Sequence, residues 1–97
     1  MNQHGLETEL NRILTRLSHL NDQQRTLAAP LVHATAQRIR DLTIECGDEG
    51  PRALPAVDPR VAAGQLQVAS ADLCRVADEK TLETATAQLT ELRRSLP

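Results

Sequence analysis

The chain has 97 residues, a formal net charge of -2 and no Phe, Tyr or Trp. This length fits one domain, so residues 1–97 are predicted to fold as a single unit whose core comes mainly from Leu, Ile, Val and Ala. The interspersed charges argue against a nucleic-acid partner and against binding to an anionic membrane. Because Leu and Ala favour helices and the residues that sheets prefer are scarce, the sequence predicts an all-α fold.

The first predicted helix covers about residues 5–20 and has the most regular apolar pattern of the chain. Its apolar residues recur at alternating steps of four and three, the a/d spacing of a helix with one apolar seam. The seam residues are Leu6, Leu10, Ile13, Leu17 and Leu20. The spacing continues to Leu27, but Asn21 and Asp22 are good capping residues and interrupt the helix. The seam is therefore predicted to serve an internal core, with Leu27 in the next helix.

The second predicted helix covers about residues 26–46 and ends at Gly47. Because proline is tolerated only at certain helix positions, Pro30 makes two start positions possible for this helix. A start at Asp22 would place Pro30 in the helix interior and kink it, whereas a start near Thr26 places it in the first turn, where no amide hydrogen bond is lost. The start near Thr26 is favoured. The apolar face of this helix is predicted at Leu31, Thr35, Ile39 and Leu42.

Residues 47–57 form the one long predicted loop, because two Gly and two Pro exclude a regular helix there. The loop is longer than an ordinary turn between bundle helices. Asp58 and Pro59 then signal a helix start, so the third helix is predicted at about residues 58–77 and the fourth at about 79–95. The inward residues predicted for these two helices are Ala62, Leu66, Ala69, Leu73, Val76 and Ala77, followed by Leu82, Ala85, Leu89, Leu92 and Leu96.

These elements predict a four-helix, up-down-up-down bundle made of two helical hairpins joined by the Gly/Pro-containing loop. The main alternative is an open pair of helical hairpins that dimerises. The apolar stripe of the fourth helix is narrow and coiled-coil-like, which is one reason to expect association with another chain.

The sequence contains no pattern that predicts catalysis, a cofactor or a metal site. Its His residues lack the Glu-x-x-His spacing of bundle metal sites, and its Gly residues lack the Gly-Lys-Ser/Thr pattern of a phosphate-binding loop. Cys46 and Cys74 match no zinc or redox spacing and are expected to be free thiols in a reducing compartment. No segment reads as a signal peptide or a membrane span, so the expected location is the cytoplasm.

Two features interrupt the amphipathic pattern and provide the candidate interaction residues. Arg38 projects among the apolar residues of the second helix, where it either reaches water or Asp41, or binds a partner. On the third helix, an outer row follows i, i+4, i+7, i+11 spacing: Gly64, Val68, Ala71 and Arg75. Gly in a helix interior costs about 1 kcal/mol relative to Ala. Close approach of another helix would explain Gly64, although a cost of this size is also tolerable.

The leading prediction is a non-catalytic helical module that binds another protein or itself through its helix faces. One alternative is a small-ligand-binding or enzymatic bundle with a cavity between the hairpins, lined by the small side chains of the third helix. The other alternative is a nucleic-acid-associated regulator, which the charge pattern disfavours. A partner surface is expected on the third and fourth helices.

Overall fold

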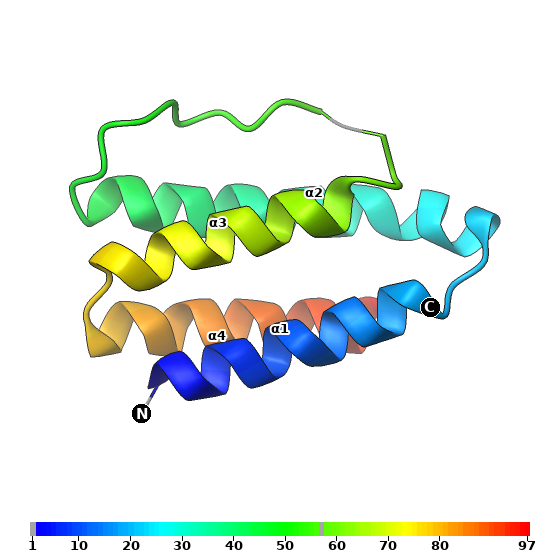
Figure 1. The fold of residues 1–97 in the computed structure, drawn as a ribbon, viewed down its shortest axis with the longest axis horizontal. Helices are drawn as coiled ribbons and strands as arrows, with labels where there is room; N and C mark the ends of the chain where they lie inside the picture. Colours follow the sequence, from blue (N-terminus) through cyan, green and yellow to red (C-terminus); the bar gives the residue numbers. More distant parts are fainter. Residues whose placement is uncertain (1, 57) are drawn as a thin grey trace.

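The computed structural model describes residues 2–56 and 58–97, and within these residues it contains four helices and no strand (Figure 1). Residue 57, the last of the predicted loop, lies outside the described residues, as does residue 1. The predicted all-α, four-helix fold is confirmed. The helices are α1 (Asn2–Ser18), α2 (Asp22–Glu45), α3 (Ala62–Val76) and α4 (Glu79–Ser95).

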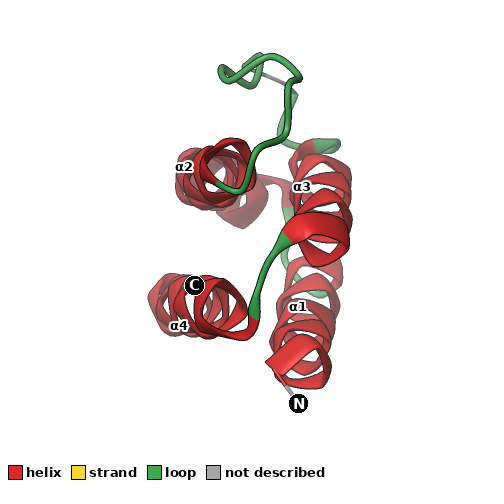
Figure 2. Ribbon diagram, turned by 90° about the vertical axis from the view of Figure 1, so that its left-hand side faces the viewer, coloured by secondary structure: helices red, strands yellow, loops and turns green. Residues whose placement is uncertain are grey.

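Viewed along their axes, the four helices lie at the four corners of one bundle (Figure 2). α2 packs mainly against α3 and α1 mainly against α4, while α2 with α4 and α1 with α3 share fewer contacts. The helices joined by short connections, α1 with α2 and α3 with α4, lie at diagonal corners (Figure 2). The two pairs of helices that pack most extensively, α2 with α3 and α1 with α4, are therefore not joined by a short turn.

The directions of the helices correct one part of the predicted topology. The direction reverses from α1 to α2 and from α3 to α4, as expected within each hairpin, but α2 and α3 run the same way (Figure 1). The loop between them returns along α2: Arg40 donates to the carbonyl oxygen of Pro51, and His33, nearer the helix N-terminus, contacts that of Leu54. The order is up-down-down-up. Parallel neighbours require a long crossover, whereas a short turn joins only antiparallel ones.

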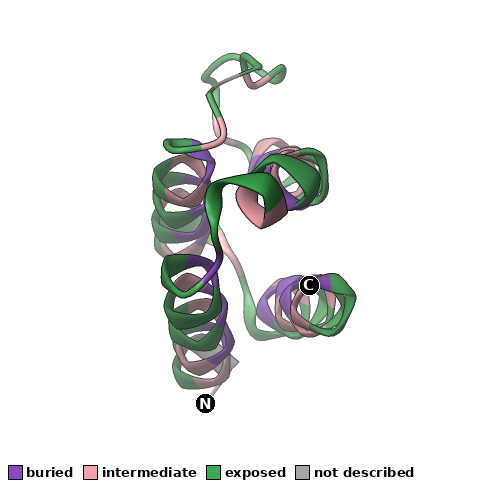
Figure 3. Cartoon of the chain, turned by 90° about the vertical axis from the view of Figure 1, so that its right-hand side faces the viewer, coloured by how far each residue is buried: buried purple, intermediate pink, exposed green. Residues whose placement is uncertain are grey.

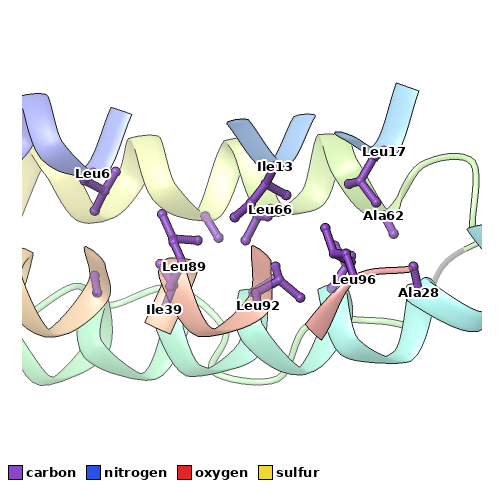
Figure 4. Close-up of a cluster of buried hydrophobic side chains, with 14 of the residues drawn as sticks. Leu6, Ile13, Leu17, Ala28, Ile39, Ala62, Leu66, Leu89, Leu92 and Leu96 are labelled. Carbon is purple, nitrogen blue, oxygen red and sulfur yellow. The ribbon is translucent and has the colours of Figure 1, made fainter. Parts of the chain in front are cut away.

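The core is formed by inward-facing side chains of all four helices (Figure 4). The seam predicted for α1 contributes Leu6, Ile13 and Leu17, and every inward residue predicted for α4 is buried. On α3 the predicted face is buried from Ala62 to Leu73 and becomes exposed at Val76. Figure 3 shows the same division, with buried segments on the inward sides of the helices and exposed segments outside.

The inward face of α2 matches the prediction at Thr35 and Ile39 but differs from it at Leu31. Leu31 is 41% exposed and Leu27 is 65% exposed, whereas Ala28 and Val32 are buried in their place. Small side chains at the buried positions allow α3 to pack close to α2 through its own Ala62. As a result, two large apolar side chains of α2 remain on the surface.

α2 begins at Asp22, so the favoured start near Thr26 is wrong. Asn21 is the N-cap: its Oδ1 accepts a hydrogen bond from the Gln24 backbone N (2.8 Å), and the Gln24 Oε1 accepts one from the Asn21 backbone N (3.0 Å). This reciprocal capping box satisfies two amides at the helix start. Pro30 consequently lies inside the helix, where it cannot donate the hydrogen bond to the Thr26 carbonyl.

α3 begins at Ala62, about one turn later than predicted. Asp58, the expected N-cap, instead accepts hydrogen bonds from the backbone N (2.9 Å) and side-chain Nε (3.1 Å) of Arg60. Hydrogen bonding by the Arg60 guanidinium and backbone lowers the pKa of Asp58. The Asp-Pro signal therefore marks a turn before the helix, because the Asp58 carboxylate is engaged by Arg60.

Candidate functional site

A groove of about 780 Å³ lies between the loop and the outer side of α3. We call it the loop groove. The loop side is lined by Pro51, Leu54 and Pro55, among others, and the α3 side by Val61 and Val68, which are 53% and 63% exposed. Large apolar side chains that remain this exposed beside a hollow are typical of binding surfaces. The loop groove is therefore the main candidate site.

Arg40 on α2 anchors the loop at one end of the loop groove. Its side chain is buried, its Nε donates to the Pro51 carbonyl oxygen (2.8 Å), and its Nη2 lies 2.7 Å from Asp48 Oδ2. The Asp48 pKa is lowered by a hydrogen bond from the Gly50 backbone N and by Arg40. A Cβ at Gly50 would collide with the Arg40 guanidinium, so a larger residue there would require this side chain to shift from its position against the loop.

Two glutamines fix the middle of the loop from both helices. Gln37 on α2 accepts a hydrogen bond from the Leu54 backbone N (2.8 Å) and donates one to the Arg52 carbonyl oxygen (2.7 Å). Gln65 on α3 donates to the Pro55 carbonyl oxygen (2.9 Å). Hydrogen bonds to both helices thus fix the position of the loop, and a groove that is already formed does not have to be ordered when a ligand binds.

Gly64 provides space on the α3 side of the loop groove. A Cβ built at this position meets no atom within 4 Å among the described residues. No helix of the same chain therefore explains the glycine by close approach. The position remains open to a group from outside the chain.

The other two residues of the row predicted on α3, Ala71 and Arg75, lie in a second groove. Ala71 and Arg75 line a groove of about 460 Å³ between α1 and α3, together with Ser70 and Cys74. Ser70 Oγ is buried and has no hydrogen-bond partner among the described residues. Burial raises the pKa of the Cys74 thiol, which disfavours the reactive thiolate. Cys74 is therefore not an activated nucleophile in this second groove.

Arg38 lies on the other flank of α2, apart from both grooves. Its side chain is exposed, and its Nη1 is 3.4 Å from Gln88 Oε1 on α4. The predicted partner Asp41 instead contacts Gln37 and Arg52. The residues of the predicted outer row thus line two different grooves, and Arg38 lines neither of these two.

The sequence interpretation missed Arg40, which is 7% exposed and holds the loop. Its position was detectable in principle, because it is four residues after Ala36 and three before Thr43, both buried on α2. The sequence pattern placed Arg38, and not Arg40, among the apolar residues of α2.

The part of the chain that the structure describes contains no group of three His, Cys, Asp or Glu side chains placed to hold a metal ion. None of the described helices is long and apolar enough to cross a membrane. Comparison with protein-family models, with curated proteins and with solved structures gives no match. The function must therefore be inferred from the geometry of this chain.

Proposed function

We propose that the protein is a non-catalytic interaction module that binds a polypeptide in the loop groove. The observation that carries this proposal is the pair of exposed valines, Val61 and Val68, which line an open hollow together with apolar residues of the loop. The charged groups at one end, Arg40 and Asp48, bind each other and the loop. They therefore serve the structure of the groove, and its apolar walls supply the binding surface.

The dimensions of the loop groove suit a segment of protein. The α3 side extends from Val61 to Asp72, which is about 16 Å along a helix axis. An apolar centre with polar groups at its end resembles the core and rim of a protein interface. Helix-in-groove binding uses this arrangement, with apolar anchors at helical spacing on the ligand.

Site-specific photocrosslinking in cells of the native host tests this proposal. A photoreactive p-benzoylphenylalanine placed at Val68 should form a covalent adduct with a protein, because this position lines the loop groove. The same residue placed at Ala87, which is exposed on α4, is the matched control and should form none. Absence of an adduct at Val68, or equal adducts at both positions, would contradict the proposal.

A small apolar ligand is the second candidate occupant of the loop groove. Gln65 lines the groove and its buried Oε1 has no hydrogen-bond partner among the described residues, so it would accept a bond from a ligand donor once the side chain turns toward the groove. Such a ligand should raise the unfolding temperature, and Gln65→Leu should reduce this shift. A library of apolar amides and alcohols that gives no shift would remove this candidate.

A further inference from the structure

We infer that the polypeptide bound in the loop groove is α2 of a second copy of this chain, so that the molecules associate head to tail. This inference rests on the proposed function and names the partner. The contacting residues of α2 are Leu27, Leu31, Ala34 and Arg38. We call them the α2 row.

The α2 row is an exposed row of three apolar side chains that ends in the charged Arg38. Leu27 and Leu31 are 65% and 41% exposed, and Ala34 and Arg38 continue the exposed row. Their spacing of i, i+4, i+7, i+11 places them on one side of the helix. Leu27 and Val68 are the two most exposed large apolar residues of the described chain, one in the α2 row and one in the loop groove.

The α3 side of the loop groove has the same spacing as the α2 row. Val61, Gln65, Val68 and Asp72 also follow i, i+4, i+7, i+11 and all line the groove. A parallel alignment of the two helices places Leu31 beside the open space at Gly64. One large side chain of the row, Leu31, thus meets a small residue in the hollow, as in packing of helix ridges into grooves.

Charge complementarity favours the same alignment. With Leu27 beside Val61, Arg38 at the other end of the α2 row comes beside Asp72. Arg38 is exposed, with one weak contact to Gln88 at 3.4 Å. Asp72 already binds Arg75, and a carboxylate can accept from two guanidinium groups. The opposite charges set the direction of the docked helix.

The α2 row and the loop groove lie on different flanks, so one molecule can use both. The loop is bound by His33, Gln37 and Arg40 on one flank of α2, whereas Leu31 and Arg38 border α4 on the other. A contact between unlike surfaces is heterologous and extends into chains or rings. A standard interface takes about 800 Å² per partner, a modest share of the 5820 Å² surface, so two such contacts fit on each molecule.

Complementation between two variants tests the inference by sedimentation velocity. The wild-type protein should grow in mass with concentration. Leu27→Glu disables the α2 row and Val68→Glu disables the loop groove, so each variant alone should associate at least about tenfold more weakly. Mixing them should restore a 1:1 dimer that grows no further, because the mixture holds one intact α2 row and one intact loop groove. Both positions are exposed, so the helical circular dichroism should remain, and Ala87→Glu is the matched control.

Other outcomes would overturn the inference in recognisable ways. Normal association of Leu27→Glu, with loss only in Val68→Glu, would show a symmetric contact between two α3 helices. A wild-type protein that stays monomeric into the millimolar range would show that no second copy binds. In that case, a crosslinked adduct of Val68 with a different protein would leave the proposed function standing, whereas absence of both results would contradict both proposals.

Discussion

Glu9 is the buried carboxylate that ties α1 to α4. Arg93 Nε donates to Glu9 Oε2 at 2.7 Å, and Arg12 Nη1 lies 3.4 Å from Glu9 Oε1. The side chain of Glu9 retains 12% of its exposure. The hydrogen bond from Arg93 is the largest cause of the lowered pKa of Glu9, with its charge and that of Arg12 acting in the same direction.

Replacement of Glu9 should reduce stability in a pH-dependent way. Because the pKa of Glu9 is lower folded than unfolded, its contribution is present above the unfolded pKa and is lost as the pH falls through the folded pKa. In urea unfolding at neutral pH, Glu9→Gln should lower the free energy of unfolding by about 1–2 kcal/mol. At low pH the difference in the free energy of unfolding between Glu9→Gln and the wild type should disappear. Glu91→Gln, at an exposed position of α4, is the control, and a gap that persists unchanged at low pH would contradict this role.

At the residue scale, the sequence identifies exposed side chains more readily than buried polar ones. The outward position of Val68 follows from helical spacing alone and is confirmed by its 63% exposure. Arg40 is buried because the loop passes over this part of α2, where the Pro51 carbonyl oxygen accepts a hydrogen bond from Arg40. No local pattern specifies that coverage, because it is a contact between elements.

The helix α2 contains a local conflict at Pro30. The capping box at Asn21 starts the helix early enough to place this proline in its interior. One backbone hydrogen bond is thereby lost, but the helix continues to Glu45 because its inward face is buried against α3. The sequence contains both the capping residue Asn21 and the helix-disfavouring Pro30, and the helix starts where the capping residue specifies.

Pro30→Ala should stabilise the protein, because alanine restores the amide donor to the Thr26 carbonyl. The expected gain in the free energy of unfolding is about 1–3 kcal/mol by urea denaturation. Pro51→Ala is the matched control in the loop, where the change should cost stability by loosening the unfolded chain. A neutral or destabilising effect of Pro30→Ala would contradict the view that the missing amide hydrogen bond weakens this helix.

At the scale of the whole molecule, the crossover loop decides both the topology and the site. By returning along α2, it makes α2 and α3 parallel neighbours and forms one wall of the loop groove. The two features are therefore one consequence of the same connection. A short turn in its place would leave the outer side of α3 without a facing wall.

The helical class and the core seams are predictable from the sequence, since apolar spacing alone identifies the buried faces of α1 and α4. The order of helix directions cannot be predicted from the sequence, because a loop of the length of residues 47–57 allows a crossover but does not require one. The candidate site was found in part: Gly64 and Val68 line the loop groove, but its facing wall belongs to a segment predicted only as a connection.

The most direct test of the account is a dilution series of the isotopically labelled protein, followed by backbone amide NMR. We expect concentration-dependent shifts at two surfaces, the α3 side of the loop groove from Val61 to Asp72 and the α2 row from Leu27 to Arg38. Amides on the outer faces of α1 and α4 should remain unchanged. Spectra that are invariant into the millimolar range, or shifts confined to α1 and α4, would contradict the central claim that the loop groove binds a second copy of the chain.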